Sequence, residues 1–144
     1  NQPLPRLMPG RFALAWPGIL PTPKKSNGLF CCNSSVRFRS IIDGTSNTLL
    51  VGERSVSSGA GIWMGVSSNE FENDQVTDSS HASRINTGYA GFSSRHPGGA
   101  LFALADGRAK LISEKISSTV GENLGVFQKL GQKDDKQHLN VDDF

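Results

Sequence analysis

The stretch GALFALADGRAKLIS, from Gly99 to Ser113, holds two apolar, strand-forming runs separated by Asp106 and Gly107. An Asp-Gly pair between two such runs is the strongest short-range signal for a β-hairpin, because a type I′ turn needs a positive φ at both central residues. The sequence therefore predicts an antiparallel hairpin with Asp106 and Gly107 at its turn.

A two-residue turn also predicts the register of the hairpin, because it places Ala105 opposite Arg108 and Phe102 opposite Leu111. In that register the two faces differ in polarity. The expected core face carries Phe102, Leu104, Ala109 and Leu111. The expected solvent face carries Ala103, Ala105, Arg108 and Lys110.

Further elements are expected on both sides of the hairpin. Period-2 alternation or short apolar runs predict strands at 35–39, 49–54 and 62–66. Thr119 and Glu122 match a capping box, which predicts a helix of about 10 residues that packs Leu124 and Phe127 on the sheet and stops at Gly131. The fold class is therefore α+β, predominantly antiparallel β, with a short C-terminal helix.

Three regions are expected along the chain. Residues 1–28 hold six of the seven prolines and predict an extended arm, in which Phe12 and Trp16 supply apolar surface for docking. Residues 29–131 form the β-rich head with its helix, interrupted by a long polar loop at 67–91. Residues 132–144 form a polar tail.

Composition excludes several partners. A net charge of +2 over 144 residues, without a basic stripe, argues against nucleic acid. The longest apolar stretch, residues 12–20, is interrupted by Pro17 and Gly18, so we expect no membrane span, although a peripheral membrane contact is compatible with the sequence. Because the chain starts at Asn1, we expect a processed product or a fragment. The adjacent Cys31 and Cys32 fit two free thiols, a vicinal disulfide or an intermolecular disulfide.

Two polar clusters invite a catalytic or metal assignment. His96 and Asp106 flank a predicted strand about 20 Å long, so we interpret them as residues that shape the two ends of the hairpin. The oxygen-rich residues 43–48 lack the ligand spacing of a calcium loop, and an Asx-turn with Thr45 or Ser46 capping one helical turn fits them better. We expect no catalytic residue, metal or cofactor. The candidate motif residues are Asp43, Gly44, Thr45, Ser46, Asn47, His96, Gly98, Gly99, Asp106 and Gly107.

The same blocks resemble a bacterial family. Residues 42–48 with 51–53 are similar to its DGTSNT…GE block, and His96, nine intervening residues, Asp106 and Gly107 match its H-x9-D-G block. These are prepilin-like proteins with a domain of unknown function and a prepilin-processing-associated signature. The resemblance covers roughly residues 28–144 and implies a pilin-like head without an established enzymatic activity. We expect a chain without the prepilin leader and long helix of the family, and Arg108 stands where a serine-like residue is usual.

The resemblance implies a non-catalytic structural or interaction protein outside the cytoplasm, in the bacterial cell envelope, with a pilin- or pseudopilin-like head. Its partners would be other protein subunits, in a homo-oligomer or a larger complex. One alternative is an accessory subunit docked on an envelope or membrane complex. A second is a carbohydrate- or small-ligand-binding module that uses Trp63 and Tyr89.

Overall fold

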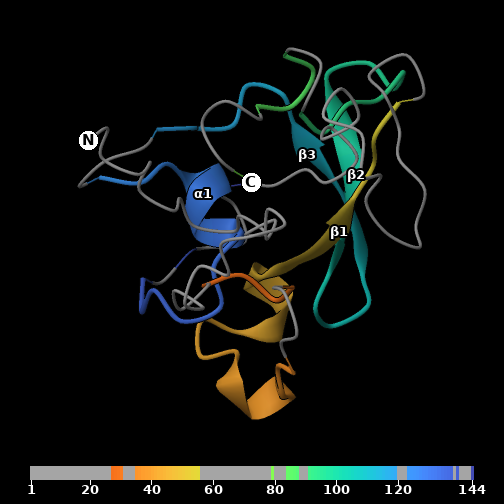
Figure 1. Cartoon of the computed structure of the whole chain (residues 1–144). Helices are drawn as coiled ribbons and strands as arrows, with labels where there is room; N and C mark the ends of the chain where they lie inside the picture. The colour runs from red at the N-terminus through yellow and green to blue at the C-terminus, as the bar shows by residue number, and fades with distance from the viewer. Residues whose placement is uncertain are drawn as a thin grey trace, which may run out of the picture.

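The computed structural model of the chain describes residues 27–30, 35–55, 79, 84–87, 91–119, 123–137, 139 and 144. These residues are mostly β, with a three-stranded antiparallel sheet in the order β1-β2-β3 and little helix (Figure 1). The strands are β1 (Leu49–Gly52), β2 (Gly99–Leu104) and β3 (Ala109–Ser113). The helical elements are α1 (Val126–Leu130) and two single 3-10 turns, η1 (Phe38–Ser40) and η2 (Thr45–Asn47).

The predicted hairpin is confirmed as β2 and β3, but the predicted register is wrong by one residue. Phe102 lies opposite Lys110, where the two-residue turn would have placed it opposite Leu111. The Leu104 N–H donates to the Arg108 carbonyl at 2.8 Å, so the loop has three residues. Only the last of them, Gly107, has a positive φ, of +87°. This is a type I turn followed by a left-handed glycine, the commonest three-residue alternative to a type I′ turn.

The shifted register changes which side chains reach the core. Phe102 and Leu104 are buried as predicted, whereas Leu111, predicted in the core, is 49% exposed opposite Leu101. Ile112 is fully buried in its place. Ala109 is also exposed, contrary to prediction.

Strand β1 confirms the strand predicted at 49–54, although it ends at Gly52. Its pairing with β2 shifts between Leu49 and Val51, which marks a β-bulge at Leu50. A bulge sets two residues of one strand against one residue of its partner and disturbs the alternation of faces. Leu50 and Val51 are therefore both exposed.

The strand predicted at 35–39 is wrong. Residues 35–37 are irregular, and η1 follows, closed by hydrogen bonds from the Ser40 and Ile41 N–H groups to the Arg37 and Phe38 carbonyls. Alternation favours a strand where the apolar side chains meet a core, but Phe38 is 75% exposed. The strand predicted at 62–66 and most of the 67–91 loop lie outside the described residues.

The C-terminal helix is present but shorter than predicted, and Thr119 is not its N-cap; Glu122, the other residue of the predicted capping box, lies outside the described residues. Gly125 is the N-cap of α1, and the Thr119 hydroxyl donates instead to the Asn123 carbonyl at 2.9 Å. Phe127 packs on the sheet as predicted, with its ring centroid 5.8 Å from that of Phe102.

Three aromatic rings join α1 to the sheet at the centre of the core. Phe92 lies 4.8 Å from Phe102 and 6.1 Å from Phe127, and all three pairs meet edge to face. Such pairs add about 0.5–1.5 kcal/mol beyond their burial. The core is completed by Ile85, Ala100, Ile112 and Leu130.

Candidate functional site

The two family-like sequence blocks, residues 42–53 and 96–107, meet at the hairpin turn. The Asp106 N–H donates to the Thr45 carbonyl at 3.1 Å, and the Ala105 N–H donates to the Thr48 carbonyl at 2.8 Å. Thr48 is fully buried, and its hydroxyl donates to the Gly44 carbonyl at 3.0 Å. The turn that opens β1 therefore supports the turn between β2 and β3.

The blocks meet again just past the C-terminal end of β1, around Glu53. The Glu53 N–H donates to the Leu101 carbonyl at 2.8 Å, and the Leu101 N–H donates back to the Glu53 Oε2 at 3.2 Å. The Ser93 N–H donates to the Glu53 carbonyl at 3.0 Å. A hydrogen bond from Ser94, assisted by the Leu101 N–H and the charge of His96, lowers the pKa of the Glu53 carboxyl.

Asp43 binds the C-terminal segment. Its Oδ2 accepts the Asp135 N–H at 2.7 Å and its Oδ1 accepts the Lys136 N–H at 2.8 Å. The Ile42 N–H donates to the Lys133 carbonyl at 2.7 Å. Burial, with a contribution from the charge of Asp43, raises the pKa of the Asp135 carboxyl. Two carboxylates therefore face each other beside η2.

The Asp106 carboxylate bonds within its own turn. Its Oδ1 accepts the Arg108 N–H at 3.0 Å, and its Oδ2 pairs with the Arg108 Nε at 2.8 Å. The Arg108 backbone N–H, assisted by the guanidinium, lowers the pKa of Asp106.

His96 is exposed, and β2 separates it from Asp106. Its backbone N–H donates to the Ser94 hydroxyl at 3.0 Å. Two nearby positions favour glycine for different reasons. Gly98 has a φ of +79°, which side-chain-bearing residues rarely adopt, and a Cβ on Gly99 would overlap the Ile112 carbonyl. Asn47 donates weakly to the Asp43 carbonyl at 3.4 Å and to the Leu139 carbonyl at 3.5 Å.

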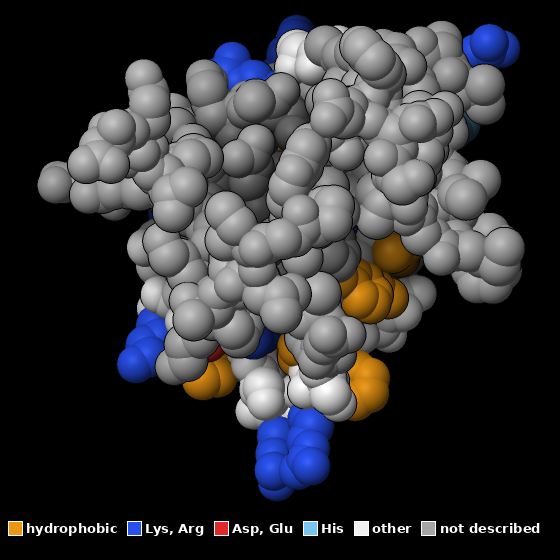
Figure 2. All heavy atoms as spheres, in the orientation of Figure 1, with side chains coloured by type: hydrophobic (Ala, Val, Ile, Leu, Met, Phe, Trp, Pro, Cys, Tyr) orange, Lys and Arg blue, Asp and Glu red, His pale blue; other side chains and the backbone are white. Residues whose placement is uncertain are grey.

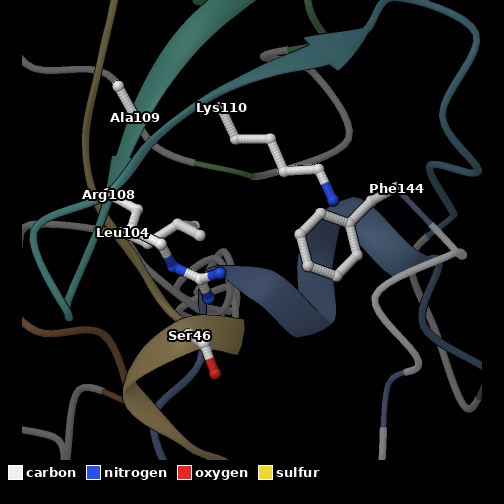
Figure 3. A pocket seen from close by; sticks show the side chains of 6 residues that line it. All are labelled: Ser46, Leu104, Arg108, Ala109, Lys110 and Phe144. Carbon is white, nitrogen blue, oxygen red and sulfur yellow. The ribbon is translucent and has the colours of Figure 1, made fainter.

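One hollow of about 180 Å³ opens beside the hairpin turn (Figure 3). The Arg108 side chain extends towards Ser46 of η2, and the Lys110 Nζ lies 3.9 Å from the centroid of the Phe144 ring. Leu104 and Ala109 complete the lining. Two cations and a hydroxyl at one hollow can attract an anionic group. Among the described residues that line the hollow, none has a histidine or carboxylate side chain to act as a general base. Within the described part of the chain, no group of three or more His, Cys, Asp or Glu side chains is placed to hold a metal ion.

Comparison with known proteins places the chain in a family. The model of the family described as "Protein of unknown function (DUF1559)" matches residues 19–119, which are 101 of the 144 residues. The chain belongs to the DUF1559 family. The match begins within the Pro-rich residues 1–28, earlier than the expected residue 28, and ends before α1. No curated protein and no solved structure matches the chain.

Sequence reasoning about this DUF1559 chain missed Gln128, which is buried at the centre of a polar network. Its Nε2 donates to the Ser79 carbonyl at 2.9 Å and to the Ser118 hydroxyl at 2.8 Å, and its Oε1 accepts the Thr119 N–H at 3.0 Å. The sequence shows only that Gln128 follows the apolar Phe127 in the predicted helix. That position does not predict that the amide side chain is buried, because glutamine is mostly exposed in proteins.

Several residues expected to make contacts are not placed. Phe12, Trp16, Trp63 and Tyr89 of this DUF1559 chain lie outside the described residues, as do Cys31 and Cys32. Among the helices that the structure describes, none has the length and apolar character to cross a membrane.

Proposed function

We propose that this DUF1559 chain is a non-catalytic structural protein of the bacterial cell envelope, located outside the cytoplasm, whose pilin- or pseudopilin-like head acts by contact with other protein subunits. The prepilin-like interpretation of the H-x9-D-G residues is part of this proposal. The observation that carries it is the use of the motif carboxylates: Asp43, Glu53 and Asp106 each accept backbone N–H groups of the fold. Polar groups engaged in this way support a scaffold better than a reaction centre.

An exposed apolar surface on the sheet supports contact as the mode of action. Val51 is 56%, Leu101 41% and Leu111 49% exposed, all on the face turned away from the aromatic core. We call these three residues the outer sheet face. Apolar side chains reach the surface beside the sheet in Figure 2. Contiguous exposed apolar residues on a small protein commonly mark a protein-contact site.

Chemical crosslinking of the purified chain tests the proposal. We expect a ladder of homo-oligomers that is lost in Leu101→Glu and in Leu111→Glu, because a charge on the outer sheet face opposes its burial. Ile42→Glu is the matched control, since Ile42 is exposed but lies outside the sheet. A chain that stays monomeric, or a ladder that is equally lost in the control, contradicts the proposal in its homo-oligomeric form.

Purification from the native membrane tests the alternative role as an accessory subunit. Co-purification at a fixed stoichiometry with unrelated membrane subunits would favour that role over self-assembly. Loss of the association in Leu111→Glu would assign it to the outer sheet face.

A further inference from the structure

The single turn η1 forms one end of the described structure, at the bottom of Figure 1. Phe38, its first residue, is 75% exposed, the largest exposure of any large apolar side chain among the described residues. None of the residues of η1 is buried. A phenylalanine held this far into water has no stabilising role in the core, because the gain from its burial is not realised.

Further apolar surface adjoins Phe38. A groove of about 370 Å³ lies beside it, and Phe30, which also lines the groove, is 48% exposed. None of the described residues that line the groove is acidic. The lining residues are Leu29, Phe30, Ser35, Val36, Phe38, Ile41, Leu50 and Ala105.

Basic side chains flank this apolar end. Arg37 and Arg39 directly precede and follow Phe38, and both are exposed. Figure 2 shows basic side chains at the same end of the molecule. The nearest carboxylate along the chain, that of Asp43, is turned to the N–H groups of Asp135 and Lys136. The end therefore presents a projecting aromatic ring between two cations.

We infer that this η1 end, defined by Phe30, Arg37, Phe38 and Arg39, docks on the surface of a lipid bilayer that contains anionic lipid. Phe38 enters the boundary between headgroups and acyl chains, and the two guanidinium groups bind lipid phosphates. Arginine suits such a boundary, because its apolar stem can be buried among the acyl chains while its guanidinium group binds the phosphates. A protein partner fits this end less well, because a protein surface would need a preformed pocket for the projecting Phe38 ring. A bilayer interface can rearrange around the ring without such a pocket.

This docking goes beyond the proposed function and does not rest on it. It involves no second protein and uses no residue of the outer sheet face. Vesicle binding can therefore fail while subunit contact stands, and the reverse also holds.

Sedimentation with vesicles tests the inference on the full chain. We expect binding to vesicles of phosphatidylcholine mixed with phosphatidylglycerol, weaker binding to phosphatidylcholine alone, and a loss of the difference at high salt. Each arginine near an anionic surface contributes about fivefold to partitioning, so the double variant Arg37→Gln, Arg39→Gln should bind about 25-fold more weakly to the mixed vesicles. Phe38→Ser should weaken binding about tenfold on both vesicle types.

Two controls carry the same chemical changes elsewhere. Arg95→Gln with Lys115→Gln removes two exposed cations at the opposite end of the sheet, and Leu111→Ser removes an exposed apolar side chain from the outer sheet face. Both controls should bind mixed vesicles as the unaltered chain does. Absence of binding by the unaltered chain, or an equal loss in the paired controls, overturns the inference. A dimer that Phe38→Ser converts to a monomer overturns it in favour of a protein contact.

Discussion

The backbone N–H of Asp106 donates to the carbonyl oxygen of Thr45 at 3.1 Å, so the turn of the hairpin rests on the turn before β1. At the other end of the β1–β2 ladder, just past Gly52, Glu53 and Leu101 exchange hydrogen bonds. The two sequence blocks are therefore the two antiparallel partners of one ladder, joined at both of its ends. Substitutions in either block should first change stability, and only through stability change any contact with a partner.

Gly98 and Gly99 should respond very differently to alanine. A Cβ on Gly99 would overlap the Ile112 carbonyl, so Gly99→Ala must displace the β3 backbone and should cost about 3 kcal/mol of unfolding free energy. Gly98 has open space around it and only a φ of +79° to maintain, so Gly98→Ala should cost about 1–2 kcal/mol. Urea unfolding of the two variants measures both values. Equal losses would show that the close approach of β2 and β3 at this position is not as described.

Gln128→Leu should destabilise the chain although it replaces an amide with an apolar side chain of similar size. It removes three hydrogen bonds and leaves the buried Ser79 carbonyl and the Thr119 N–H without their partner, at a cost of about 3 kcal/mol. Gln137→Leu is the control, because Gln137 is exposed, and should change stability by less than about 0.5 kcal/mol. Hydrogen exchange at the Thr119 amide should accelerate in Gln128→Leu alone; unchanged exchange would contradict the network.

The existence of the hairpin could be predicted from the sequence, and its register could not. Apolar runs around Asp106 and Gly107 are a local signal, but a type I′ turn and a type I turn followed by glycine both accept these residues. The Ala105 and Asp106 N–H groups donate to the Thr48 and Thr45 carbonyls, which lie far away in the sequence. The observed turn is therefore accompanied by a tertiary contact with residues 45–48. The sequence around the turn does not indicate this contact.

The contacts of the candidate site likewise include some that the sequence predicts and others that it does not. The role of Asp106 within its turn follows from local chemistry, because Asp side chains commonly bond the backbone two residues on. The bonds from Asp43 to the backbone of Asp135 and Lys136 span more than 90 residues and have no local signature. Gln128 was missed for a related reason, since its burial depends on Ser79 and Ser118.

Asp106 offers a graded test of the turn. Asp106→Asn keeps an oxygen acceptor for the Arg108 N–H and loses the ion pair, whereas Asp106→Ala loses both. Thermal unfolding midpoints at neutral pH should therefore fall in the order unaltered chain, Asn variant, Ala variant. Because the pKa of Asp106 is lowered on folding, its charge stabilises the fold above the ordinary pKa of about 3.9, and this advantage over Asn is lost as the pH falls through the lowered value. An Ala variant as stable as the unaltered chain would contradict the role of the carboxylate.

Asp135→Asn should stabilise the chain at neutral pH. Burial and the charge of Asp43 raise the pKa of Asp135, so its ionised form is less favourable in the folded state than in the unfolded chain. An amide removes that penalty, can still accept the Gln137 N–H, and can donate to the Asp43 carboxylate, for a gain of about 1 kcal/mol.

The sign of the pH dependence identifies the cause of that gain. The folded state binds the proton of Asp135 more tightly than the unfolded chain, so the penalty is complete above the raised pKa and disappears below about 3.9. Urea unfolding across this range should therefore show the advantage of Asp135→Asn shrinking as the pH falls. Asp134→Asn is the matched control, because Asp134 pairs with Lys133 at 3.1 Å and its replacement should bring no gain. A gain that is independent of pH, or one shared by the control, would show that the cost of ionising Asp135, from its burial and from the charge of Asp43, is not the source of the gain.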